Sequence, residues 1–141
     1  VYAVGYADPY NDDCARLEIV THCDDDSEVA AYADSIAERA AETEREYQSA
    51  WQLGREYAAA SETIVANRET RKTLFAELRT VTLPPTICET IRAKIKSTRR
   101  NIREALDTQR RITSDYVMRG DLLSAFADGA DMTLDDAKAL C

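Results

Sequence analysis

The sequence predicts an all-α fold: a long antiparallel helical hairpin or bundle with short terminal helices. The first observation is that Ser27–Val81 contains no proline and only one glycine, Gly54. The second is that apolar or small residues recur there every three to four positions, as they do when a helix buries one face. The third is that 141 residues with four glycines and three prolines hold too few turn formers for a many-stranded sheet. We therefore expect one helical domain over residues 1–141.

Residues 1–26 are expected to form an N-terminal arm. The first part, residues 1–11, carries three tyrosines with glycine and proline, and should be extended, its tyrosines covering part of the bundle. The pair Asp12-Asp13 can then cap a short helix over residues 15–20.

The first long helix is expected over residues 27–82. Ser27 and the three aspartates before it supply an N-cap and negative charge where the helix dipole favours it. Pro84 and Pro85 end this helix, because a proline disfavours helical geometry in the residue before it. The apolar stripe of the helix consists of Val29, Tyr32, Ile36, Ala40, Tyr47, Trp51, Gly54, Tyr57, Ala58, Ser61, Ile64, Val65, Phe75, Leu78 and Val81.

The second long helix is expected over residues 85–127, with Pro85 in its first turn. Residues 128–131, Asp-Gly-Ala-Asp, should break it. Thr133 and Asp136 then resemble a capping box that opens a last short helix over residues 133–141. The stripe of the second long helix consists of Ile87, Ile91, Ile95, Ile102, Leu106, Ile112, Tyr116, Leu123 and Phe126.

Two packings of these helices fit the sequence. A continuous first helix gives a hairpin with Cys88 at its tip, and the apolar stripe favours it because the stripe passes straight through Gly54. A break near Gly54 gives a compact three- or four-helix bundle, in which Cys88 could pair with Cys23 or Cys14. We favour the continuous hairpin, in which Cys88 makes no disulfide within its own chain.

The cysteines indicate in which cellular compartment the protein functions. The four cysteines, Cys14, Cys23, Cys88 and Cys141, form an even set, which in a small secreted domain indicates disulfides and in the cytosol buried thiols. A start at Val1 is compatible with removal of a secretory signal. We therefore expect disulfides and an extracellular, cell-surface or periplasmic protein.

The sequence predicts no catalytic, cofactor-binding or metal-ligating residue, and hence no cofactor and no enzyme. Glu18 is at the wrong spacing from His22, the only histidine, for a di-iron helix bundle. The eight residues between Cys14 and Cys23 exceed the usual spacing of structural zinc ligands. The aspartate clusters at 24–26 and 128–136 do not match a calcium loop, and helix capping explains them better.

Charge is distributed unevenly, although the formal sum is −8. Residues 24–46 hold nine acidic and two basic residues, whereas residues 92–111 hold eight basic and two acidic residues. The basic side chains follow one helical face, and we expect them to line a helix-helix interface and pair with acidic neighbours, with an acidic protein partner as the alternative. They are Arg92, Lys96, Arg99, Arg103 and Arg110.

Neither nucleic acid nor a membrane is an expected partner. No aromatic residue interrupts the basic face to stack on bases, and the chain as a whole is acidic. No apolar run approaches the length of about 18 residues that a membrane span needs. The central aromatic residues Tyr47, Trp51 and Tyr57 should pack in the core, with a partner-facing patch as the alternative.

Three functional hypotheses follow. The first is a binding module that contacts a macromolecular partner, expected to be a protein, through the sides of its helices. The second is a structural assembly subunit of the phage or filament type, which completes its core by self-association. The third is a periplasmic inhibitor or immunity protein that uses the aspartates at 24–26 and 128–136 as its contact surface.

Overall fold

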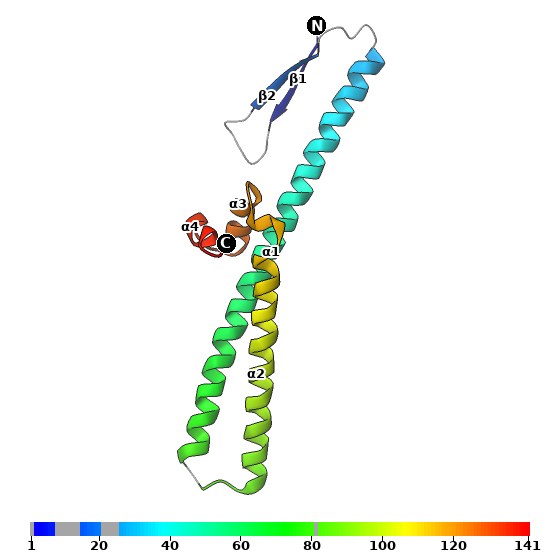
Figure 1. Ribbon diagram of the computed structural model, residues 1–141. Coiled ribbons are helices and arrows are strands. Elements are labelled where there is room, and N and C mark those ends of the chain that lie inside the picture. Colours follow the sequence, from blue (N-terminus) through cyan, green and yellow to red (C-terminus); the bar gives the residue numbers. More distant parts are fainter. Residues whose placement is uncertain (1, 8–14, 21–25, 81) are drawn as a thin grey trace. The chain divides into compact units, whose positions relative to one another are not determined.

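The computed structural model describes residues 2–7, 15–20, 26–80 and 82–141 (Figure 1). The contacts divide the chain into two compact units, Val1–Tyr47 and Gln48–Cys141, which are described separately below. Most of the described residues are helical, and the long antiparallel helical hairpin that the sequence predicts is confirmed. Among the described residues, no helix is both long and apolar enough to cross a bilayer.

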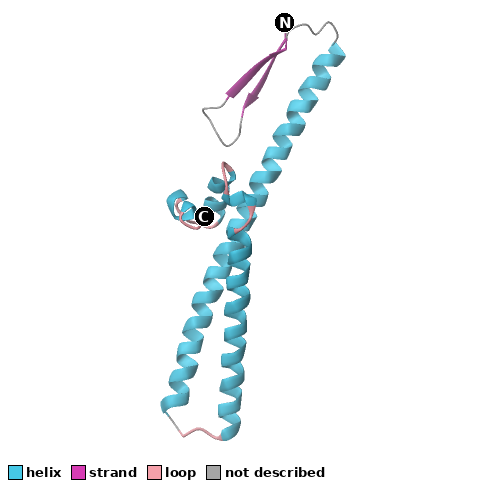
Figure 2. Ribbon diagram, viewed as in Figure 1, coloured by secondary structure: helices cyan, strands magenta, loops and turns pink. Residues whose placement is uncertain are grey.

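The first unit contains a β-hairpin and the first part of helix α1 (Asp26–Thr80) (Figure 2). Strands β1 (Tyr2–Ala7) and β2 (Ala15–Val20) pair antiparallel, with Tyr2 opposite Val20 and Ala7 opposite Ala15. The expected short helix over residues 15–20 is therefore wrong. Leu17 and Ile19 alternate with the charged residues Arg16 and Glu18, a two-residue period that is typical of a strand rather than of a helix.

Helix α1 runs without a break from Asp26 to Thr80 and passes through Gly54. The continuous first helix is thus confirmed, and the bundle broken near Gly54 does not form. The helix ends two residues before the predicted boundary, just ahead of the segment Thr82–Pro84, which leads into helix α2 (Pro85–Thr113). Pro84 is the N-cap residue of α2 and Pro85 occupies the first helical position, where its missing N–H costs nothing.

The second unit is built on the antiparallel pair formed by the later part of α1 and the whole of α2 (Figure 1). Two apolar clusters join the helices. One contains Ala60, Ile64 and Ala105, and the other, nearer the tip, contains Leu74 with Ile91 and Ile95. The buried residues of α2 follow one another at alternating steps of four and three, the seam of an antiparallel coiled coil. They are Ile91, Ile95, Thr98, Ile102, Ala105 and, seven residues further on, Ile112.

The second long helix is shorter than the predicted 85–127, because α2 ends at Thr113. Asp115 caps a single 3₁₀ turn, η1 (Tyr116–Met118), by accepting a hydrogen bond from Val117 N at 3.2 Å. Gly120, with φ of +88°, then reverses the chain into α3 (Leu122–Gly129).

The last helix, α4 (Leu134–Lys138), begins at the predicted cap. Thr133 Oγ1 accepts a hydrogen bond from Asp136 N at 3.1 Å and donates one to Asp136 Oδ2 at 2.7 Å. The break predicted over residues 128–131 begins later than expected, because α3 includes Asp128 and Gly129 and ends there, and Asp131 adopts a positive φ of 53° just beyond it.

Helices α3 and α4 and the η1 turn form a C-terminal cap at the open end of the hairpin (Figure 1). Phe126 at its centre is fully buried. The centre of its ring lies 5.7 Å from the centre of the Tyr57 ring, and the two rings pack edge to face. The backbones of α1 and α3 touch at Gly54 and Gly129: a side chain at Gly54 would overlap the carbonyl oxygen of Phe126, and one at Gly129 would overlap that of Trp51. This contact fixes the cap on the hairpin.

Candidate interaction surface

The residues that most resemble catalytic or metal-binding groups give no site in the structure. The described residues contain no group of three or more His, Cys, Asp or Glu side chains placed to hold a metal ion. His22, Cys14, Cys23 and the aspartates at 24 and 25 lie outside the described residues, so the expectations about them stay predictions. Asp136 belongs to the capping arrangement of α4, as expected, because its carboxylate accepts a hydrogen bond from the N-cap residue Thr133.

The two described cysteines are free thiols at opposite ends of the hairpin. Cys88 is half-buried in the first turn of α2, and its Sγ lies 3.8 Å from Leu83 O. Cys141 is exposed at the C-terminus, with its Sγ 3.0 Å from Met118 O. Disulfides, expected from the even cysteine count, are therefore not formed by either of these residues.

Polar contacts along the hairpin seam fix the register of α2 against α1. Asn101 Nδ2 donates to Asn67 Oδ1 at 3.3 Å, and Gln109 Nε2 donates to Ser61 Oγ at 2.7 Å. A shift of α2 by one turn would leave these half-buried groups without partners, which costs more than an apolar mismatch. The seam thus determines which side chains of α2 face outward.

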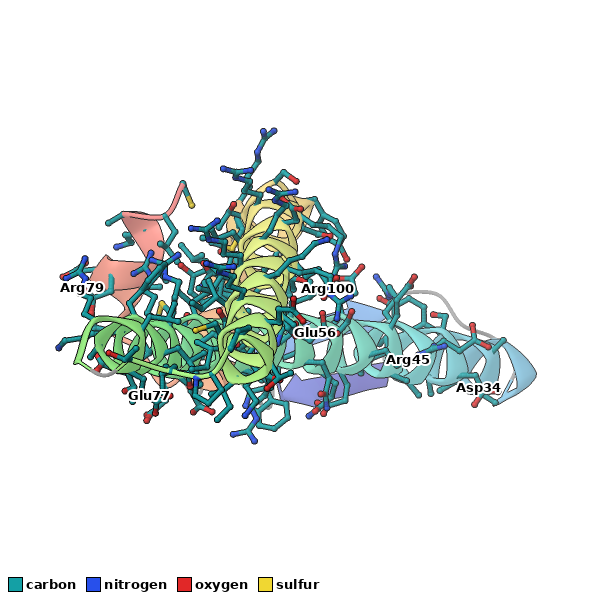
Figure 3. The ribbon with its side chains drawn as sticks, turned by 90° about the horizontal axis from the view of Figure 1, so that it is seen from below. Asp34, Arg45, Glu56, Glu77, Arg79 and Arg100 are labelled. Carbon is teal, nitrogen blue, oxygen red and sulfur yellow. The ribbon has the colours of Figure 1, made fainter. Side chains whose placement is uncertain are left out.

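Arginine and lysine residues form a continuous basic face on the outer side of α2. We define this basic face as Arg92, Lys96, Arg99 and Arg103, all of which are exposed. Steps of four, three and four residues keep the four side chains within about 60° of one another around the helix. Figure 3 shows side-chain nitrogens gathered around α2, with Arg100 pointing to the side where Glu56 of α1 also lies.

The basic face differs from the expected salt-bridged interface. Within the part of the chain that the structure describes, none of its four residues makes an ion pair. Arg110, one further turn along, pairs with Asp107 of its own helix at 3.4 Å. The ion pair that joins the two helices is instead Arg111 with Glu56, at 2.9 Å. Among the described residues, these four neighbouring cations thus have no counter-charge within ion-pair distance.

The charge of the chain is separated by segment. Residues 1–47 hold 13 acidic and 3 basic residues, residues 48–113 hold 7 acidic and 13 basic, and residues 114–141 hold 6 acidic and 2 basic. The hairpin therefore carries a net charge of +6, although the chain as a whole carries −8. A local positive potential on an otherwise acidic protein attracts negatively charged surfaces.

The other side of the hairpin holds an open groove of about 480 Å³ between the two helices. Its lining includes the small side chains of Ala59, Thr63 and Thr108 together with Glu56, Glu104 and Arg111. The groove carries both signs of charge, and its charged residues are already paired, Glu56 with Arg111 and Glu104 with Arg100. The basic face is therefore the more distinctive feature.

The exposed apolar side chains that the structure describes do not gather into a patch that could serve as a recognition surface. Among the residues whose burial the structure describes, the four large exposed hydrophobic ones, Val65, Ile87, Tyr116 and Leu134, lie on four different elements. Single exposed apolar residues of this kind are normal on a protein surface. Of the central aromatic residues, Tyr57 packs against Phe126, and Trp51 is half-buried with the Arg55 guanidinium 5.7 Å from its ring centre.

Comparison with known proteins gives no match: no family model, no curated protein and no solved structure is similar to this chain.

Sequence analysis identified the basic face but not its lack of counter-charges. The composition of residues 92–111 reveals the excess of positive charge, whereas the partner of each cation depends on which part of α1 lies beside α2. The seam contact between Asn67 and Asn101 sets which part of α1 lies beside α2. No signal in the sequence alone identifies that pair of residues.

Proposed function

We propose that this protein is a non-enzymatic helical binding module that recognises an acidic protein surface through the basic face of α2. The observation that carries the proposal is the row of four exposed cations without an ion pair among the described residues. The row is straight and about 16 Å long, at 1.5 Å rise per residue from Arg92 to Arg103. A helix with carboxylates on one face matches such a row in both shape and charge.

Nucleic acid is a weaker candidate for the partner. Proteins that bind single strands alternate cations with aromatic side chains that stack on bases, and no aromatic residue lies between Arg92 and Arg111. Binding to duplexes draws on a strongly basic domain, whereas this chain carries −8.

Two lysines of α2 provide a matched pair of variants. Lys94 and Lys96 are both exposed and lie two residues apart, which places them about 200° apart around the helix. Only Lys96 belongs to the basic face. Lys94→Glu and Lys96→Glu therefore change the net charge equally but alter opposite sides of α2.

The test is a fluorescence anisotropy titration with a synthetic helical peptide that carries glutamates on one face. A peptide of the same composition, with its glutamates spread around the helix, serves as the ligand control. We expect the one-faced peptide to bind more tightly, and Lys96→Glu to weaken binding by about tenfold, since reversal replaces an attraction with a repulsion. Lys94→Glu should weaken it less than about threefold. Equal losses for the two variants, or tighter binding of duplex DNA than of the peptide, would contradict the proposal.

A further inference from the structure

The first unit of the chain carries an acidic counterpart of the basic face. Asp34, Glu38, Glu42 and Glu46 of α1 are all exposed, and none makes an ion pair with the described residues. Steps of four residues place them in a row that winds slowly around the helix. We define these four residues as the acidic face. Arg45 stands at its C-terminal edge, where its Nε donates a hydrogen bond to Ala41 O at 3.1 Å.

The acidic and basic faces match in charge and in length. Each contributes four like charges on consecutive turns of a helix. At 1.5 Å rise per residue, Asp34 to Glu46 spans about 18 Å and Arg92 to Arg103 about 16 Å. The acidic row turns by about 40° at each step, so two helices laid side by side could bring two or three of its carboxylates at a time against the basic face.

We propose that the acidic partner of the basic face is the acidic face of a second copy of this chain. This inference rests on the proposed function, because it names the occupant of the same surface. Contacts between the copies are electrostatic, since the large exposed hydrophobic residues are scattered over separate elements. Exposed ion pairs are individually weak and screened by salt, so the association is reversible and depends on ionic strength.

The primary test is sedimentation equilibrium of the whole chain over a wide concentration range, at low and at high salt. At low salt, we expect the weight-average mass to rise above the 15.8 kDa of the monomer as concentration increases. At about 1 M salt, where the screening length is only about 3 Å, the mass should return to that of the monomer. A monomer at every concentration, or a salt-independent oligomer, would overturn the proposal.

Variants then locate the contact. Lys96→Glu should weaken self-association by about tenfold, whereas Lys94→Glu should change it by less than about threefold. The double variants Lys96→Glu with Arg99→Glu, and Glu38→Lys with Glu42→Lys, should each be monomeric. An equimolar mixture of the two doubles should form a heterodimer, because the first double keeps an intact acidic face and the second keeps an intact basic face. Circular dichroism before the experiment verifies that each variant keeps its helical content.

The outcomes separate this inference from the proposed function. A chain that binds the one-faced acidic peptide but stays monomeric would refute only the second copy as the partner. Failure of the two double variants to form a complex, with each helical on its own, would show that their faces do not meet. Loss of both peptide binding and self-association in Lys96→Glu, but not in Lys94→Glu, supports both proposals.

Discussion

At the scale of single residues, two glycines allow the C-terminal cap to dock on the hairpin. Gly54 of α1 and Gly129 at the end of α3 bring the two backbones into contact, and a methyl group at either position would meet a carbonyl oxygen of the facing helix. In the sequence, Gly54 looks like a weak point of a long helix. Its actual role depends on a segment some seventy residues further along the chain, which local patterns do not reveal.

We predict that Gly54→Ala destabilises the protein by about 2 kcal/mol or more, although alanine gains about 1 kcal/mol in helix propensity. The added methyl group must push α3 away and thereby expose Phe126, which is completely buried. The free energy of unfolding, measured by urea denaturation, checks this. Gln52→Ala, an exposed change on the same helix, is the control and should stay within about 0.5 kcal/mol of the wild type. A Gly54→Ala protein as stable as the control would show that the glycine contact is dispensable.

At the scale of helices and strands, local signals predict most boundaries. The Pro84-Pro85 turn, the continuous α1 and the Thr133 cap are confirmed, because each depends on residues within a few positions of one another. The end of α2 could not be placed in the same way. Ile112, Leu123 and Phe126 keep a helical spacing, yet they are buried by separate elements that the chain reaches by turning at Asp115 and Gly120.

The seam of the hairpin gives the prediction that belongs to this scale. Ile95 is only 6% exposed and packs against Leu74, whereas Ile87 of the same helix is 46% exposed. Ile95→Ala should lower the free energy of unfolding by about 2–4 kcal/mol, because it removes buried methyl groups and leaves a cavity. Ile87→Ala should lower it by less than about 1 kcal/mol. Similar losses in thermal or urea unfolding for the two variants would mean that the register of the seam differs from the one described.

At the scale of the whole molecule, the main property is the separation of charge into an acidic N-terminal part and a basic hairpin. The sequence predicts both segments, but it also suggests that the basic one is neutralised by neighbours, which the structure does not bear out for Arg92, Lys96, Arg99 and Arg103. Residues 48–80 of α1 carry nearly equal numbers of acidic and basic side chains, so α2 has no acidic helix beside it. Because residues 48–80 do not neutralise the basic face, we propose that its acidic partner belongs to another chain.

The cysteines give the last prediction, which also tests the expected extracellular, cell-surface or periplasmic location. Cys88 and Cys141 are free, and α2 alone, 29 residues long, would hold them about 40 Å apart. The remaining pair, Cys14 and Cys23, lies outside the described residues, on either side of strand β2 (Ala15–Val20) in the sequence. A disulfide within the chain, as expected from the even cysteine count, can therefore join only these two residues.

We therefore expect the native monomer to contain one disulfide, Cys14–Cys23, and two thiols. Iodoacetamide labelling followed by mass spectrometry should give two labelled sites before reduction and four after it, with the exposed Cys141 reacting faster than the half-buried Cys88. A Cys14→Ser variant is the control: because Cys23 then has no partner within the chain, the variant should give three labelled sites both before and after reduction. Four labelled sites in the native protein before reduction would contradict the disulfide, and with it the oxidising compartment that the even cysteine count suggests.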